Sequence, residues 1–251
     1  YIMGFKCGIV GLPNVGKSTL FNALTKKISA EAANYPFCTI EPNEGTVAVP
    51  DDRIYKLSKI ANSKKIIPAP LTFFDIAGLV KGASKGEGLG NKFLSHIREV
   101  DAIIHVVRCF EDDNITHVNN KIDPVDDVET INTELILADL EMIEKLIGNL
   151  EKLQKKGDKD ASKKIVIANK ILDHLSQGKP ARSIDNIHEQ EDEIKEFNLI
   201  SIKPIIYVCN VDESSIISGN NLTAALSDEV KDGKIIIISA EIESQISLLD
   251  E

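Results

Sequence analysis

The chain has 251 residues, of which 43% are hydrophobic and 27% are charged, a balance typical of a globular protein and not of a disordered or collagen-like one. No apolar run reaches the roughly 18 residues of a membrane span. The net charge of −10 argues against a protein that coats nucleic acid or anionic lipid with its whole surface. These two observations predict no membrane partner. The four cysteines show no CxxC pairing, so we expect reduced thiols and a cytoplasmic location.

Short apolar runs rich in β-branched residues predict buried parallel strands. They lie at Phe5–Val10, Leu71–Ile76, Ala102–Val107, Pro204–Cys209 and Lys234–Ser239. Residues Gly45–Val49 are expected to add an antiparallel edge strand, and a helix is expected from Ser18 to about Ser29. This alternation predicts an α/β fold with a doubly wound sheet.

A different pattern begins at Asp127, where apolar residues recur at spacings of three and four as far as about Lys156. After a polar turn, a second helical stretch runs to Gly178. Two helices with narrow apolar stripes around a short turn predict an antiparallel, coiled-coil-like hairpin. A third, acidic helix is expected at Ile184–Phe197.

These patterns predict an α/β domain formed by residues 1–126 and 203–251, with an inserted helical domain at 127–202. The insert is locally basic: residues 145–182 hold ten Lys or Arg and four Asp or Glu, and 10 − 4 gives +6. No long exposed apolar stripe demands a dimer, so we expect a monomer.

The run Gly11–Ser18 reads GLPNVGKS and satisfies G-x-x-x-x-G-K-[ST] between an apolar strand and a helix. In such a loop, backbone N–H groups at a helix N-terminus surround a phosphate. Lys17 is expected to neutralise the β- and γ-phosphates as a catalytic residue, and the Ser18 hydroxyl to bind Mg²⁺. The expected nucleotide-binding residues of this loop are Asn14, Val15, Gly16, Lys17, Ser18 and Thr19.

Further elements follow in the order that a nucleotide switch requires. Thr39 lies in a loop from which its hydroxyl can reach Mg²⁺. Asp75 ends an apolar strand and can hold Mg²⁺ through water, and the N–H of Gly78 can contact the γ-phosphate. The glycines between residues 82 and 90 predict a segment that orders and disorders with the phosphate state.

Two segments compete for the role of reading the base. Asn120–Asp123 matches the guanine-reading pattern N-K-x-D letter for letter, but follows a polar loop. Asn210–Glu213 matches it poorly in letters, but follows a buried strand. We therefore take Asn120–Asp123 as a chance match. The expected base-site residues are Asn210, Val211 and Glu213, together with Ser239 and Ala240 after the last strand.

We expect ATP to be preferred over GTP. Glu213 stands where guanine readers carry Asp, and Val211 stands where they carry Lys. A site built for one donor–acceptor pattern leaves buried groups unpaired with the other base. The alternative is that Asp212 shifts by one position and restores guanine reading.

Three stretches of this sequence together resemble the YchF type of Obg-like ATPases. They are Gly4–Thr19, Pro36–Asn43 and Asp75–Gly82. The resemblance extends over essentially the whole chain, including the helical hairpin. It implies a P-loop domain interrupted by an α-helical coiled-coil domain and followed by a small C-terminal TGS domain, which we expect to be absent from these 251 residues. It also implies a link to the ribosome.

Switch GTPases carry a Gln after D-x-x-G to orient the attacking water, and here that position is Leu79. We therefore expect slow hydrolysis with another source of charge or orientation. Asn14 is a candidate ligand for K⁺, the alternative being a structural role in its turn. His117 is a candidate catalytic residue for positioning water, the alternative being a solvated loop residue.

These observations favour a Mg²⁺-dependent hydrolase of ATP or GTP that acts as a switch on the ribosome or RNA through the basic hairpin 145–182. The competing interpretation of the hairpin is a solvated face. The competing function is a nucleotide-dependent, GTP-preferring binding module with negligible hydrolysis. A small-molecule kinase is disfavoured, because the sequence shows no acceptor-binding Arg cluster or lid pattern.

Overall fold

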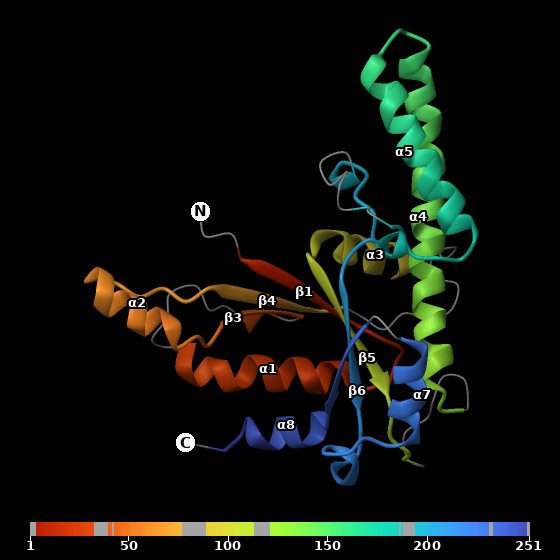
Figure 1. Ribbon diagram of the computed structural model, residues 1–251. Coiled ribbons are helices and arrows are strands. Elements are labelled where there is room, and N and C mark those ends of the chain that lie inside the picture. Colours follow the sequence, from red (N-terminus) through yellow and green to blue (C-terminus); the bar gives the residue numbers. More distant parts are fainter. Residues whose placement is uncertain are drawn as a thin grey trace. The chain divides into compact units, whose positions relative to one another are not determined.

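The computed structural model describes residues 4–32, 40–41, 43–76, 89–112, 121–185, 187, 194–230 and 233–249 (Figure 1). The chain divides into two compact units. The sheet unit comprises residues 1–78, 100–124 and 205–251, and the helical unit comprises residues 79–99 and 125–204.

The sheet unit is built on a mixed sheet in the order β2-β3-β4-β1-β5-β6-β7. The strands are β1 (Phe5–Val10), β2 (Ile40–Glu41), β3 (Glu44–Ala48), β4 (Pro70–Asp75), β5 (Ala102–Arg108), β6 (Ile205–Asn210) and β7 (Lys234–Ile238). Strands β4, β1, β5, β6 and β7 are parallel, whereas β3 runs antiparallel to both β2 and β4.

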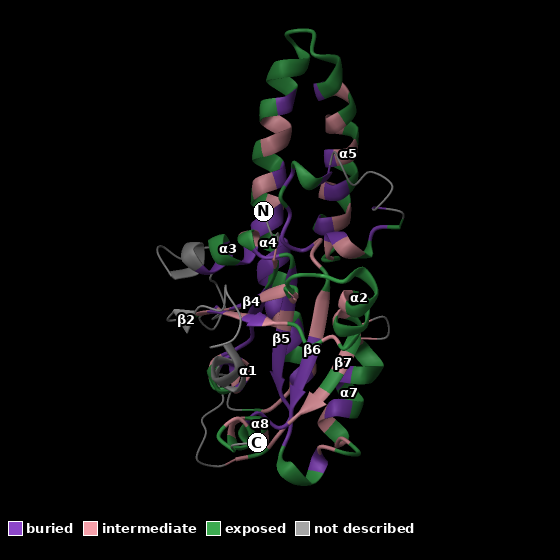
Figure 2. Cartoon of the chain, turned by 90° about the vertical axis from the view of Figure 1, so that its left-hand side faces the viewer, coloured by how far each residue is buried: buried purple, intermediate pink, exposed green. Residues whose placement is uncertain are grey.

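Helices cover both faces of this sheet. They are α1 (Lys17–Ala32), α7 (Asn221–Glu229) and α8 (Ala240–Ile246). A further helix, α2 (Arg53–Ala61), lies in the connection between β3 and β4 and has no buried residue. Figure 2 shows α1 and α8 on one face and α7 on the other. Among the central strands, Ile9, Val10 and Ile103 are fully or almost fully buried, which explains why these strands read as continuous apolar runs.

The helical unit contains α3 (Leu89–Glu99), α4 (Pro124–Gln154, of which Pro124 belongs to the sheet unit), α5 (Lys159–Ser176) and the short 3₁₀ helix η1 (Ala181–Ser183). Helices α4 and α5 form an antiparallel hairpin (Figure 1). Pro124 suits the first position of a helix, where no N–H donor is needed. Asp158 caps α5 by accepting from the N–H groups of Asp160 and Ala161 at 2.9 and 3.1 Å.

The hairpin packs around a core of its own. Ile136 and Ile143 of α4 lie in one buried cluster with Ala168, Ile171 and Leu175 of α5. Of the α4 positions that the apolar spacing selects, Ile131, Leu135, Ala138 and Leu150 are buried, whereas Met142 and Leu146 are only partly buried. Toward the tip of the hairpin the core ends, and Leu153 is 43% exposed.

A polar connection anchors the return segment of the helical unit. Asp139 of α4 is buried, and its carboxylate accepts from the N–H groups of Ile200 and Ser201 at 2.9 and 2.7 Å. The Arg98 guanidinium of α3 donates to the carbonyl oxygen of Asn198 at 2.8 Å, and Lys203 donates to the carbonyl oxygen of Arg98 at 3.0 Å. The segment 198–203 is therefore held by both α3 and α4.

The predicted fold class is confirmed, with differences in detail. The expected edge strand at residues 45–49 is β3, but β2 pairs outside it, so β3 is not the edge. Residues 79–99 group with the helical unit, although the sequence placed them with the sheet, because α3 is bonded to α4 and to segment 198–203. The expected helix at 184–197 lies largely outside the described residues.

Two further expectations concern membranes and thiols. Over the residues described, no helix is both long and apolar enough to cross a bilayer. Cys7, Cys109 and Cys209 are buried free thiols, and burial together with the charge of Asp101 raises the pKa of Cys7 to about 11.

Candidate nucleotide-binding site

The G-x-x-x-x-G-K-S loop follows β1 and leads into α1, which begins at Lys17. Gly16 has a φ of +98°, and a Cβ there would lie 2.4 Å from the Asn210 side-chain nitrogen. Both the backbone angle and the close approach require glycine. The sequence pattern is thus explained by the conformation that places loop N–H groups at a helix N-terminus.

Lys17 is buried within the loop that it is expected to serve. The residue is only 7% exposed, and its Nζ donates to the carbonyl oxygen of Leu12 at 2.7 Å. Burial lowers the pKa of Lys17, while the negative charge of Asp75 opposes that shift. The Lys17 side chain therefore reaches back across the loop to Leu12. A lysine that neutralises bound phosphates has to keep its ammonium group within this loop.

Two predicted metal ligands from distant motifs meet beside this lysine. Ser18 Oγ donates to Asp75 Oδ2 at 2.7 Å, although 57 residues separate them in the sequence. A hydroxyl and a carboxylate are hard oxygen ligands of the kind that Mg²⁺ takes. The residues present thus fit the expected ion.

Asn210, at the end of β6, is a buried connector. Its Nδ2 donates to the carbonyl oxygen of Val15 at 3.0 Å, and its Oδ1 accepts from the N–H of Ala240 at 2.9 Å. The sequence prediction placed this amide against the base. The structure shows it bonded to the phosphate loop and to α8, so its amide is engaged in positioning both.

The other predicted base-site residues lie around this connector. The N–H of Val211 donates to the carbonyl oxygen of Ile238 at 2.8 Å, and Ser239 caps α8. Asp212 begins the short 3₁₀ helix η3 (Glu213–Ser215) and accepts from Ser214 Oγ and the Ser215 N–H at 2.7 and 3.0 Å. Its capping role was missed, although an Asp ahead of two serines is a recognisable turn signal.

Several predicted positions lie outside the described residues. They are Thr39, Gly78, Leu79, His117 and Asn120. Of the N-K-x-D look-alike, Lys121 and Asp123 are described and pair with each other at 2.7 Å, just before α4. The interpretation of this segment as a chance match stays a prediction.

The geometry agrees with comparisons to known proteins. The 50S ribosome-binding GTPase family matches residues 6–170. The ribosome-binding ATPase YchF of Bacillus subtilis is 55% identical, over 99% of this chain and 69% of that protein. The chain belongs to the YchF family. The YchF protein of Escherichia coli O157:H7 is 50% identical over the same shares. The solved Schizosaccharomyces pombe YchF GTPase matches at a TM-score of 0.83, with 38% identity over 99% of this chain and 68% of that one.

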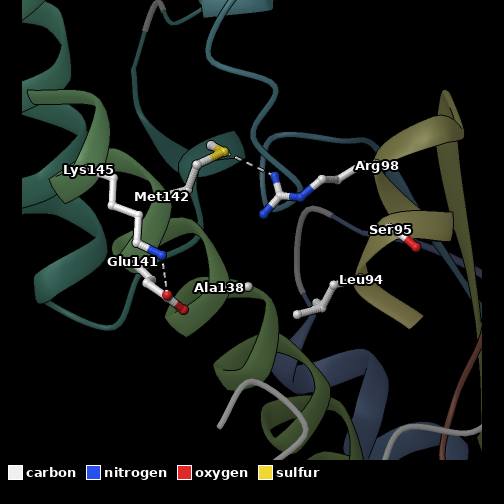
Figure 3. A pocket seen from close by; sticks show the side chains of 7 residues that line it. All are labelled: Leu94, Ser95, Arg98, Ala138, Glu141, Met142 and Lys145. Atoms are coloured by element: carbon white, nitrogen blue, oxygen red, sulfur yellow. Dashed lines mark hydrogen bonds and ion pairs between the residues drawn. The ribbon is translucent and has the colours of Figure 1, made fainter. Parts of the chain in front are cut away.

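Away from the site of this YchF-family chain, side chains of α3 and α4 line an open pocket of about 300 Å³ (Figure 3). Leu94, Ala138 and Met142 form part of its wall. Arg98 Nη1 donates to Met142 Sδ at 3.2 Å, and Lys145 pairs with Glu141 at 2.5 Å. Because its charged groups bond to one another or to the backbone, we interpret the pocket as a surface depression of the helical unit and assign it no ligand.

Proposed function

We propose that this chain is a Mg²⁺-dependent nucleotide hydrolase that prefers ATP over GTP and associates with the ribosome in the cytoplasm. The observation that best supports the proposal is the hydrogen bond from Ser18 Oγ, at the end of the phosphate loop, to Asp75 Oδ2. The names of the bacterial relatives, ribosome-binding ATPase, support the same activity and partner.

The chemistry that these residues supply is charge and orientation. The loop N–H groups and Lys17 surround the β- and γ-phosphates, and Ser18 and Asp75 would hold the ion. Bound Mg²⁺ supplies positive charge that offsets the charge developing on the transferred phosphoryl group. Asn210 keeps the loop in place through Val15.

The water-orienting group is part of the proposal. Leu79 replaces the glutamine of switch GTPases and offers no hydrogen bond. Asn14 is exposed and adopts a left-handed φ of 63°, which suits an Asn in a turn. Its exposed side chain is proposed to act in addition as a ligand for K⁺. His117 is proposed to position water.

The ATP preference is supported by the environment of Asp212. For this carboxylate to read guanine, it would have to leave the Ser214 hydroxyl and the Ser215 N–H that it accepts from. The cost of breaking this cap opposes the shift in register that GTP reading requires. Glu213 is exposed and lies one position later.

Hydrolysis is tested by phosphate release from ATP with Mg²⁺ and with EDTA. We expect Mg²⁺-dependent release in the wild type and a loss of about a hundredfold or more in Lys17→Ala and Ser18→Ala. Lys234→Ala, an exposed lysine on β7, is the matched control and should keep wild-type turnover. Wild-type turnover in either loop variant would refute the site.

The same assay separates the second candidate function. The absence of a glutamine at position 79 favours a nucleotide-dependent binding module that hydrolyses negligibly. That function requires tight nucleotide binding without release above background. Base preference is tested separately, by ATP and GTP affinities of the wild type and Asp212→Asn. A GTP preference lost in that variant would show that Asp212 reads guanine.

Ribosome association is proposed to use the tip of the helical hairpin. Lys155, Lys156, Lys159 and Lys163 are exposed there. Lys164 differs, since it is paired with Asp160 and Glu196 at 3.0 and 2.5 Å and its side chain is only 18% exposed. These hydrogen bonds raise the pKa of Lys164 to about 12, so this lysine braces the hairpin.

A further inference from the structure

Strands β3 and β4 are antiparallel neighbours, but the connection between them is unusually long. Ala48 pairs with Pro70, and the N–H of Val49 donates to the carbonyl oxygen of Ala69 at 2.9 Å, which closes the base. Such a connection needs only about two to five residues. Here it consists of residues 49–69 and carries α2. Joining the strands does not explain its length.

Helix α2 contributes nothing to the core. None of its nine residues is buried, and Figure 2 colours it green and pink throughout. Ile54 and Ser58 are half-buried, whereas Leu57 and Ile60 are 62% and 81% exposed. The helix therefore presents aliphatic side chains to solvent, which a helix kept only for packing would turn inward.

The charge along this helix is mainly positive, although the exposed Asp52 precedes it. Residues 53–67 contain five Lys or Arg and no Asp or Glu, in a chain whose net charge is −10. Arg53 is engaged by Asp51, with Nη2 and Oδ2 at 2.7 Å. The four cations that follow are exposed lysines, Lys56, Lys59, Lys64 and Lys65, and none pairs with a described acidic residue.

We propose that the α2 surface, formed by Leu57 and Ile60 with the neighbouring Lys56 and Lys59, docks an acidic amphipathic helix of another protein. Exposed aliphatic side chains within a charged rim are the anatomy of a protein interface. The sign of the rim requires carboxylates on the partner. This inference is independent of the proposed hydrolysis and of the hairpin.

Nucleic acid and membrane fit the surface less well. Phosphate groups would engage the lysines but would leave Leu57 and Ile60 in water, and Tyr55 is the only aromatic residue of α2 available for stacking on a base. Interfacial membrane helices bury a longer apolar stripe, and many run to about 20–30 residues. Nine residues with two strongly exposed aliphatic side chains offer less area.

The test uses a helical peptide of about 18 residues with leucines along one face and glutamates beside them, and a matched peptide with lysines in place of the glutamates. Fluorescence anisotropy measures binding to the purified chain. We expect the acidic peptide to bind with a Kd of about 100 µM or tighter. Leu57→Ser with Ile60→Ser, and separately Lys56→Glu with Lys59→Glu, should each weaken it about tenfold.

The most decisive test is charge reversal, because the Lys56→Glu, Lys59→Glu variant should bind the lysine peptide instead of the acidic one. Val166→Ser, 70% exposed on α5, and Lys234→Glu, exposed on β7, are the controls and should leave binding unchanged. The variants alter only exposed side chains, and circular dichroism checks that they fold. Failure of the acidic peptide to bind, or binding that the α2 variants leave unchanged, would overturn the proposal. So would α2 variants that weaken binding to an RNA duplex or to phosphatidylserine vesicles instead.

Discussion

Each compact unit contains a buried polar side chain that hydrogen-bonds two backbone groups far from it in the sequence. One side chain is an amide and the other is a carboxylate. Asn210 in the sheet unit donates to one group and accepts from another, joining the phosphate loop to α8. Asp139 in the helical unit only accepts, from two successive N–H groups. An amide is suited to a mixed pair of partners, and a carboxylate to two donors.

The difference also separates function from stability. Asn210 touches Val15 within the loop that is proposed to bind phosphate, so it positions the site. Burial raises the pKa of Asp139, which hydrogen bonds from Ile200 and Ser201 and the charge of Arg98 oppose. Its bonds all lie within the helical unit, so its contribution is to hold the return segment in place.

The largest expected effect is on the stability of Asp139→Ala. The variant leaves two buried N–H groups without their acceptor, and each such orphaned group costs about 1–3 kcal/mol. We expect the free energy of unfolding to fall by about 3 kcal/mol in urea denaturation, with ATP affinity kept. Asn cannot accept from both donors, so Asp139→Asn should be nearly as destabilising. A stable Asp139→Ala variant would contradict the assigned role.

Unlike Asp139→Ala, Asn210→Ala should lower ATP affinity as well as stability. It removes the link from the loop to α8, and we expect ATP affinity to fall by about tenfold or more, with a loss of about 1–3 kcal/mol in stability. Asn210→Asp keeps the acceptor for Ala240 but loses the donor to Val15. If the bond to the loop is what matters, calorimetric titration with ATP will show the two variants to be similarly impaired; wild-type affinity in both would refute it.

The sequence predicted those features that repeat or have a fixed pattern. The apolar runs located the parallel strands, and the G-x-x-x-x-G-K-S pattern located the loop, because both depend on local spacing. The pairing of Ser18 with Asp75 followed from knowing that both serve one ion. The role of Asn210 did not follow, since its partners are set by the packing of β6 against the loop and α8.

Other features were missed for lack of a periodic signal. Helix α2 buries nothing, so no core requirement shapes its sequence. Lys164 looked like the neighbouring lysines of the hairpin tip, and only its approach to Glu196, 32 residues away, distinguishes it. Long-range partners of this kind are outside the reach of local patterns.

A smaller effect should separate the two kinds of lysine in the hairpin. Charge reversal of Lys155, Lys156 and Lys163 should weaken ribosome or RNA binding and lower the salt slope by about 0.7–0.9 for each phosphate that is no longer neutralised. These side chains are exposed, so thermal stability should not change. Lys164→Glu should instead lower the melting temperature, because it places like charges beside Asp160 and Glu196. Unchanged affinity in the triple variant would remove the hairpin from the proposed function.

The smallest effect concerns Asp212 and pH. Hydrogen bonds from Ser214 and Ser215 lower the pKa of its carboxyl below the ordinary value. A carboxyl with a lowered native pKa stabilises the folded form above its unfolded pKa, and this contribution is lost as the pH falls through the native pKa. Protection of the Ser215 N–H, corrected for the intrinsic pH dependence of exchange, should therefore be constant near neutrality and fall at acidic pH. Asp212→Asn keeps an acceptor oxygen without a titrating charge and should remove that dependence. If the variant follows the wild-type pH curve, another group controls η3, and Asp212 is not held in its cap away from guanine.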